Sequence, residues 1–227
     1  MPLDRNAQKE LRDAPWRSVD ELRAFVEGVG AVDRRDVDAL LNLLTDPKLD
    51  HGPQHQTRCS AFKALCLRAP DPSFFEPLVN ALGTDDTLLR RAIVAVLPKV
   101  NDVDRHELLC AQLGHPDREV RRDVAAVLDA VGGPSALREL QRLVAKQTFP
   151  GRRDAIEVMV PKARHRAIEL LGAVLAAGTM PDRLRAIELL GDRELMSGDV
   201  GAAVGQVVTA LDDRDPRIAE AAFKAFA

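Results

Sequence analysis

Aspartate, histidine and cysteine side chains, which are common metal ligands, gather between residues 50 and 66. Asp50, His51 and His55 lie in the stretch DHGPQH, which has the composition of a loop. Three ligands within six residues that include Gly-Pro match no established zinc spacing closely. Cys59 and Cys66 are seven residues apart on one helical face, which indicates packing rather than zinc binding. We therefore predict no metal site and no cofactor.

The sequence also lacks the patterns that assemble a nucleophile with a base and an orienting group. It contains no G-x-S-x-G, no H-E-x-x-H and no Cys/His signature. Gly132-Gly133 follows a helical pattern rather than a strand, so it is interpreted as a helix end and not as a phosphate-binding loop. We predict that the chain is not an enzyme.

Arginines recur at a nearly constant interval and are the strongest candidates for a functional surface. A first row consists of Arg58, Arg90, Arg121, Arg153 and Arg183. A second set beside it consists of Arg91, Arg122, Arg152 and Arg185. A guanidinium can bridge a carboxylate and carbonyl oxygens at once, so we predict that the first row is a structural ladder between repeats. We predict that the second set binds a partner; the alternative is that both rows line one groove for an anion or an acidic partner.

A helical pattern that repeats about every 31 residues must position these arginines. From residue 36 onward the chain alternates two kinds of short helix, six times over. The second helices are predicted to end on Leu65, Leu97, Leu128, Val160, Leu190 and Phe226. In 117–133, for example, Val120, Val124 and Val127 make one face apolar. Such a short helix is not stable alone and must pack on a neighbour, which is typical of stacked-repeat proteins.

Two regions depart from this regularity, and one of them is the last junction, which is lengthened around residues 192–199. The first repeat has a longer internal turn at 45–56, which is a candidate binding element because unusual loops in repeat proteins often carry function. The helical patterns 152–160 and 162–177 are predicted to be separated by Pro161. Before the repeats, Ser18 and Glu21 have the spacing of a capping box, so residues 18–29 are predicted to form an N-terminal capping helix with Trp16 packed against it.

The composition narrows the classes of partner and the cellular compartment that we expect for the chain. The 227 residues carry 32 Lys and Arg against 35 Asp and Glu, a net charge of -3, which disfavours nucleic acid and anionic membranes as general partners. No apolar run is long enough to insert into a membrane. The three cysteines fall in apolar helical patterns and no secretory signal is present, so we expect buried, reduced thiols in the cytoplasm.

The stretches LGHPDREVRRDVAAVLDAVGG and ALDDRDPRIAEAAFKAF resemble HEAT repeats, in the short bacterial form also found in phycobilisome-lyase-type proteins. RLRAIELLG at 183–191 is similar to the second helix of such a repeat. The resemblance covers 36–227 and implies an all-α fold, a right-handed α-solenoid of about six HEAT-like helical hairpins with an N-terminal helical cap. We accordingly expect residues 1–35 to form the N-terminal segment and cap, and 36–227 to form a single repeat domain.

The function expected from these features is a non-catalytic scaffold that presents a concave repeat surface to a protein or peptide partner, such as an acidic segment. The resemblance leaves open an enzyme or ligand-binding protein, either bilin lyase-like or DNA-binding and glycosylase-like. Phe223 and Phe226 end the last repeat without a polar cap, so we expect self-association through the C-terminal repeat, or further repeats if this chain is the N-terminal module of a larger protein.

Overall fold

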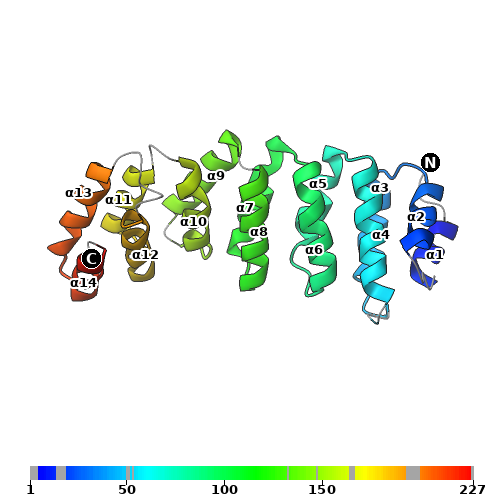
Figure 1. Ribbon diagram of the computed structural model, residues 1–227, viewed down its shortest axis with the longest axis horizontal. Coiled ribbons are helices and arrows are strands. Elements are labelled where there is room, and N and C mark those ends of the chain that lie inside the picture. Colours follow the sequence, from blue (N-terminus) through cyan, green and yellow to red (C-terminus); the bar gives the residue numbers. More distant parts are fainter. Residues whose placement is uncertain are drawn as a thin grey trace. The chain divides into compact units, whose positions relative to one another are not determined.

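The computed structural model describes residues 5–13, 19–49, 52, 54–131, 133–146, 148–163, 167–192 and 200–225. Within these residues the secondary structure consists of fourteen α-helices and four short 3-10 turns, and no strand (Figure 1). The expected all-α, HEAT-type solenoid fold is confirmed. From α3 onward the helices pair in chain order into six hairpins, as the 31-residue pattern predicted.

Helix contacts divide the chain into two compact units, Met1–Val131 and Gly132–Ala227. This division differs from the boundary that we expected after residue 35. The N-terminal helices belong to the first unit because α1 and α2 both pack on α4, the second helix of the first repeat. The boundary between the two compact units falls between the third and fourth repeats, and the single repeat domain expected for 36–227 stays a prediction.

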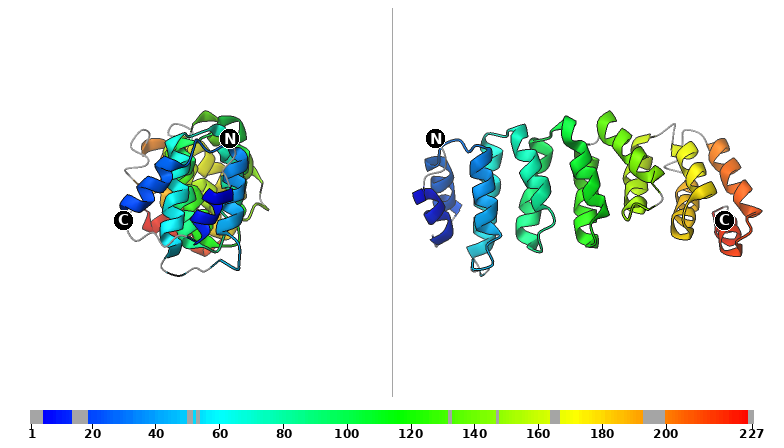
Figure 2. Two further views of the ribbon diagram at one scale, coloured as in Figure 1. Left: turned by 90° about the vertical axis from the view of Figure 1, so that its right-hand side faces the viewer. Right: turned by 180° about the vertical axis from the view of Figure 1, so that it is seen from behind.

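The first unit contains the N-terminal helices and three repeats. Its helices are α1 (Arg5–Asp13), α2 (Val19–Gly28), α3 (Arg34–Leu44), α4 (Gln54–Arg68), α5 (Phe75–Ala81), α6 (Thr87–Val96), α7 (His106–Ala111) and α8 (Arg118–Val131). The first helices α3, α5 and α7 contact one another in sequence, and so do the second helices α4, α6 and α8. Figure 1 shows the second helices of this unit in front, and the right panel of Figure 2 shows the first helices.

The core of the first unit lies between these two layers. Its largest fully buried side chains include Phe62, Phe74, Phe75, Leu78 and Ile93. Each of these comes from an apolar stripe of a short helix, so every hairpin depends on its neighbours to remove that stripe from water.

Aspartates begin several helices because the first N–H groups of a helix have no partner within it. Asp33 accepts a hydrogen bond from the backbone N–H of Asp36, whose side chain accepts from Asp33 in return, and this capping box begins α3. Asp86 caps α6 by accepting from the N–H groups of Leu88 and Leu89 at 2.9 and 3.1 Å.

The N-terminal cap is held by an arginine that sequence analysis did not single out. Arg68, the last residue of α4, donates hydrogen bonds to the carbonyl oxygens of Val26, Val29 and Gly30 at the end of α2. The final carbonyls of a helix lack partners, and a cation there also complements the helix dipole. Trp16 and the capping residue Ser18 lie outside the described residues.

The second unit contains the last three repeats. Its helices are α9 (Pro134–Ala145), α10 (Arg152–Ala163), α11 (Ala167–Ala177), α12 (Met180–Leu190), α13 (Val200–Leu211) and α14 (Pro216–Lys224). The second helices again contact in sequence, α10 with α12 and α12 with α14. Pro161 does not end α10, contrary to the prediction: the helix continues to Ala163, and the missing N–H of Pro161 falls in its last turn, where it disturbs little of the helix.

Candidate functional site on the second helices

Arg90 of α6 joins two successive second helices in the first unit. Its side chain is buried, and its Nε donates to Oδ2 of Asp123 on α8 at 2.7 Å. Its Nη1 donates to the carbonyl oxygen of Thr84, in the turn before α6, at 2.9 Å. One guanidinium therefore satisfies a carboxylate of the next repeat and a carbonyl of its own repeat.

Arg152 and Arg183 make the same kind of link in the second unit. Arg152 on α10 is 6% exposed; it donates to the carbonyl of Val144 at 2.7 Å and to Oδ2 of Asp182 at 3.1 Å. Arg183 on α12 donates to the carbonyl of Leu175 at 2.6 Å and to Oδ2 of Asp213. In each case the carbonyl lies in the last turn of the first helix, where no intrahelical donor is available.

Two further arginines of the predicted ladder, Arg58 and Arg121, lie in the first unit. Arg121 on α8 is half-buried, and its Nη1 donates to the carbonyls of His115 and Pro116, both at 2.9 Å, in the turn of its own repeat. Arg58 is buried in α4.

Arg152 and Arg153 have exchanged the roles that the sequence analysis gave them. Arg152, predicted to face a partner, is buried and bridges two repeats. Arg153, predicted to be structural, is 57% exposed, and among the described residues its ion pair is with Glu157 of its own helix, at 3.3 Å. The error came from taking Val160 as the last core residue of α10. Met159 is fully buried, and counting from it gives the arginines 90, 121, 152 and 183 a constant interval of 31 residues.

Arg91 and Arg122, predicted to bind a partner, are exposed on α6 and α8. Arg122 is 79% exposed and approaches Glu119 only to 3.8 Å. Arg185, from the same predicted set, is already engaged: it pairs with Glu157 of α10 and Glu188 of its own helix, both at 2.9 Å. The prediction that Arg185 faces a partner is therefore not supported by its geometry.

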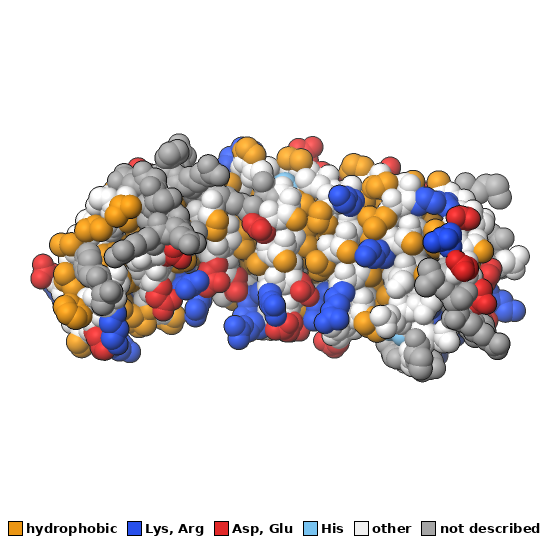
Figure 3. Space-filling model, in the orientation of Figure 1, with side chains coloured by type: hydrophobic (Ala, Val, Ile, Leu, Met, Phe, Trp, Pro, Cys, Tyr) orange, Lys and Arg blue, Asp and Glu red, His pale blue; other side chains and the backbone are white. Residues whose placement is uncertain are grey.

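A surface pocket of about 190 Å³ lies between α4 and α6. Gln56, Ser60 and Lys63 stand on the α4 side, at successive turns of that helix. Arg91 stands on the α6 side, with Leu88 and Ala92 as apolar surface beside it. Among the residues that the structure describes, neither Lys63 nor Arg91 forms an ion pair, so both cations are available to a ligand. Figure 3 shows Lys and Arg side chains gathered near the N-terminal ends of α6 and α8, which are the lower ends in that view.

Cys59, at the edge of this pocket, belongs to a buried polar cluster with His55 and Asp86. His55 is 1% exposed, and its Nε2 lies 3.5 Å from Sγ of Cys59 and in contact with Oδ2 of Asp86. The metal-binding atoms of the three residues all lie within 4.8 Å of one another. Burial, together with the charge of Asp86, raises the pKa of the Cys59 thiol to about 12, against a partly compensating effect of Arg58. The thiol is therefore protonated at neutral pH and is a poor nucleophile.

Sequence analysis missed this cluster for two reasons. It placed His55 in a loop beside Asp50 and His51, whereas His55 lies in the first turn of α4. Asp50 and His51 are outside the described residues, as is most of the centre of the 45–56 turn. It also assigned Cys59 to packing alone. The signal that could have revealed the cluster is that His55 and Asp86 are 31 residues apart, one repeat period, so stacking brings them together.

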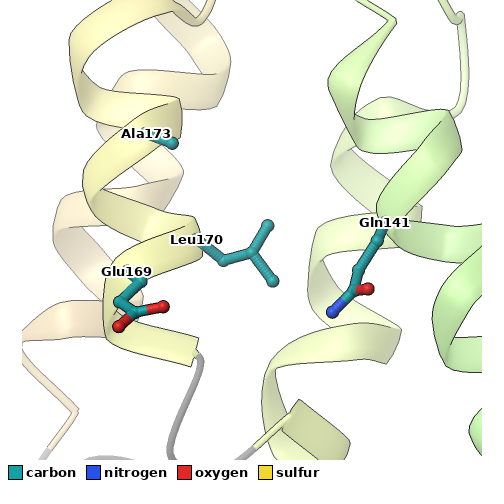
Figure 4. A pocket seen from close by; sticks show the side chains of 4 residues that line it. All are labelled: Gln141, Glu169, Leu170 and Ala173. Atoms are coloured by element: carbon teal, nitrogen blue, oxygen red, sulfur yellow. The ribbon is translucent and has the colours of Figure 1, made fainter.

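A second pocket, of about 280 Å³, lies in the second unit between α9 and α11. Figure 4 shows Leu170 of α11 directed toward Gln141 of α9, with Glu169 and Ala173 beside it. Its lining combines one carboxylate and one amide with apolar surface. These side chains supply no cation and no nucleophile, so this pocket offers less chemistry than the one between α4 and α6.

Glu76 at the start of α5 is another repeat-linking residue that sequence analysis missed. It accepts hydrogen bonds from Arg34 of α3 at 2.9 Å and from Arg105, which immediately precedes α7. The hydrogen bond from Arg105 is the main reason that the pKa of Glu76 lies below its ordinary value. The first-helix layer of this unit is thus joined by ion pairs, as the second-helix layer is.

Comparison with known proteins agrees with these repeat-to-repeat contacts. Residues 75–160, which include both Arg90 and Arg152, match the family model for HEAT repeats. The match does not distinguish the phycobilisome-lyase-like type. No curated protein matches the chain. Among the described residues no helix is both long and apolar enough to cross a bilayer. The family match shows that residues 75–160 consist of HEAT repeats, and the helical hairpins on either side follow the same order of helices.

Proposed function

We propose that this protein is a non-catalytic scaffold that binds an acidic segment of a protein or peptide on its second helices. The observation that carries the proposal is the different environment of adjacent arginines: Arg90 is buried in an ion pair with the next repeat, whereas Arg91 is exposed and has no ion pair among the described residues. HEAT repeats commonly mediate protein interactions, which supports this class of function.

The partner's chemistry is suggested by the pocket between α4 and α6. Lys63 and Arg91 place two cations over a short apolar surface made by Leu88 and Ala92, and Arg122 extends the positive charge onto the next second helix. A peptide with two or three carboxylates spaced along an extended or helical segment complements this pattern. Gln56 and Ser60 offer further hydrogen bonds to its backbone.

The cluster of Cys59 and His55 does not favour a catalytic alternative. A cysteine nucleophile needs a low pKa and a base held by a third group. Here burial raises the pKa of the thiol, and the same histidine nitrogen, Nε2, faces both the thiol and the carboxylate. In a catalytic triad the two imidazole nitrogens face different partners.

The test is a charge reversal on the exposed arginines, Arg91→Glu with Arg122→Glu. The tagged double variant and the wild type are used to capture partners from the native cell, and captured proteins are quantified by mass spectrometry. Arg35→Glu is the matched control, because Arg35 is an exposed arginine of the first-helix layer. We expect the double variant to be folded by circular dichroism and to capture at least tenfold less of one partner than the wild type does. The control should retain that partner, and salt should elute it. Equal capture by the double variant and the wild type contradicts the proposal.

A second surface supports self-association through the C-terminal repeat. Four large apolar side chains of α13 are exposed at helical spacing: Val200, Val204, Val208 and Leu211. Phe223 of α14 is 70% exposed, and Figure 3 shows hydrophobic side chains across this part of the second unit. We propose that this stripe packs against a second copy or a further repeat. Sedimentation analysis of the wild type and of the double variant Val204→Glu with Val208→Glu tests this self-association. The wild type should be an oligomer and the double variant a monomer. A monomeric wild type contradicts self-association.

We propose a cytoplasmic location because the cysteines form no disulfide bond. Cys59, Cys66 and Cys110 are all buried free thiols, which fits a reducing compartment. Fractionation of native cells tests this directly, since recovery of the chain from an oxidising compartment contradicts it.

A further inference from the structure

The His55, Cys59 and Asp86 cluster has the composition and geometry of a transition-metal site. His55 and Cys59 are four residues apart on α4, so one helical turn places both side chains on the same face. Asp86 reaches them from the N-terminus of α6, in the next repeat. All three are largely buried: His55 and Cys59 are below 4% exposed, and the Asp86 side chain is 11% exposed.

The distances suit a tetrahedral ion. A zinc ion that holds a nitrogen at ~2.0–2.1 Å and a thiolate sulfur at ~2.3 Å places these two atoms ~3.6 Å apart. The Nε2 of His55 and the Sγ of Cys59 are 3.5 Å apart. Oδ2 of Asp86 lies close enough for all three donor atoms to fall within 4.8 Å of one another. The three donors therefore lie close enough together to share one ion, provided that Oδ2 of Asp86 moves away from Nε2 of His55 to make room for it.

The carboxylate of Asp86 is held in place for this role. Its Oδ1 accepts hydrogen bonds from the backbone N–H groups of Leu88 and Leu89, and its Oδ2 is directed at His55. Metal ligands are commonly oriented by hydrogen bonds of this kind, which lower the entropic cost of binding. The helix cap and the cluster thus use different oxygens of one side chain.

The pocket between α4 and α6 adjoins the cluster at Cys59. Cys59 lines that pocket together with Ser60, Lys63 and Arg91, so a ligand bound there would meet two cations. Three protein ligands with an open fourth position are the arrangement of zinc sites that exchange water for another ligand. Water, or a carboxylate of an acidic ligand, has the chemistry to fill it.

We propose that His55, Cys59 and Asp86 bind one Zn²⁺ ion, which joins the first and second repeats and keeps its fourth position open to the α4–α6 pocket. A nitrogen, sulfur and carboxylate donor set favours zinc over calcium and magnesium, which take oxygen ligands. On binding, the thiol of Cys59 loses its proton to solvent and the thiolate bonds to the ion, with no change in oxidation state. The site is independent of the proposed partner surface, although the two adjoin.

Cobalt(II) binding to the full-length chain tests this proposal. Protein freed of metal with a chelator is titrated with cobalt(II) chloride under reducing conditions. We expect one cobalt per chain, a thiolate-to-cobalt charge-transfer band and the intense visible bands of tetrahedral cobalt, all displaced by zinc chloride. Zinc should also raise the melting temperature of the wild type, because it binds only the folded chain at this site.

Variants separate this site from other thiols and histidines. Cys59→Ser should abolish the charge-transfer band and the thermal shift. His55→Gln should weaken cobalt binding by more than ~10–100-fold, which is the cost of losing a residue that only hydrogen-bonds to a metal ligand. Cys66→Ser is the matched control, because Cys66 is a buried thiol of the same helix outside the cluster. The proposal is wrong if the wild type binds no stoichiometric cobalt, or if Cys59→Ser retains the band that Cys66→Ser loses. Far-ultraviolet circular dichroism establishes that each variant is folded before titration.

Discussion

The α4–α6 junction of the first unit and the α10–α12 junction of the second join equivalent helices by different chemistry. In the second unit, Arg152 lies in the junction and bridges a helix-end carbonyl and the buried carboxylate of Asp182. In the first, an imidazole, a thiol and a carboxylate converge from His55, Cys59 and Asp86. Both junctions pair residues about one repeat period apart, 30 residues in one and 31 in the other.

This difference shows that the repeat position determines which residues meet, whereas it does not determine their chemistry. Stacking determines which positions of neighbouring repeats meet, because the period of the chain is the spacing of the stack. The residue types at those positions then decide the chemistry. A guanidinium and a carboxylate form a closed, fully bonded link. Imidazole, thiol and carboxylate can each donate an electron pair to a metal, so the α4–α6 junction contains a candidate ligand set.

Removing Arg152 should produce the largest loss of stability. Arg152→Ala leaves Asp182 buried without its cation and the Val144 carbonyl without its donor. Breaking a buried ion pair from one side costs about 3–5 kcal/mol. Urea unfolding followed by circular dichroism measures the effect. A loss below about 1 kcal/mol would show that water replaces the guanidinium, and the second-unit junction would then not depend on this link.

Removing His55 should have a smaller effect on the metal-free chain. His55→Ala deletes a buried side chain and its contact with Asp86, but Asp86 keeps the hydrogen bonds that cap α6. Loss of one buried hydrogen-bonding partner costs about 1–3 kcal/mol. The same urea measurement, made in the presence of a chelator, checks this. A loss equal to that of Arg152→Ala would contradict the distinction between the two junctions.

Acidification should destabilise the first unit through His106, which lies in α7. Its Nε2 is 2.7 Å from Oδ1 of Asn101, and its Nδ1 is buried with no hydrogen-bond partner among the described residues. Burial lowers its pKa, against a smaller opposite effect of the Asp102 and Glu107 charges. The unfolded chain then binds a proton more readily than the folded chain, so stability is lost as the pH falls below about 6.5, the ordinary histidine pKa.

The melting temperatures of wild type and His106→Gln at pH 7.5 and pH 5.5 measure this effect. We expect the wild type to lose more stability between the two pH values than the variant does. Parallel losses in the two proteins would contradict the assignment to His106.

The smallest effect is expected from Arg153→Ala, one residue from the largest. Arg153 is 57% exposed and forms an ion pair with Glu157 of its own helix. Exposed pairs of this kind contribute about 0.3–0.5 kcal/mol. Urea unfolding should therefore give a curve close to that of the wild type. A loss comparable to that of Arg152→Ala would restore the original assignment of Arg153 to the structural ladder.

Periodicity predicted the fold well because each hairpin must bury an apolar stripe on its neighbours. The six hairpins and the structural use of Arg90 and Arg183 follow from that register. The exchange of Arg152 and Arg153 shows the limit: one residue turns a helix by about 100°, which separates a buried side chain from an exposed one. A constant interval of 31 residues would have placed both correctly.

The candidate site was less predictable because it depends on residues from different repeats. His55 was interpreted as a loop residue rather than as a neighbour of Cys59 on one helix, and the approach of Asp86 required the stacking register. Arg68 and Glu76 were missed for a related reason. Their partners are 29 to 42 residues away and lie on elements outside the second-helix rows.

The separation of a buried row from an exposed row is tested most directly by comparing Arg90→Ala with Arg91→Ala. The two residues are adjacent on α6, so both variants make the same chemical change in the same helix. Arg90 is buried and bonded to Asp123, whereas Arg91 is exposed, with no ion pair among the described residues. From urea unfolding we predict a loss of at least about 1–3 kcal/mol for Arg90→Ala and less than about 0.5 kcal/mol for Arg91→Ala. Equal losses, or a larger loss for Arg91→Ala, would contradict this division between the two rows.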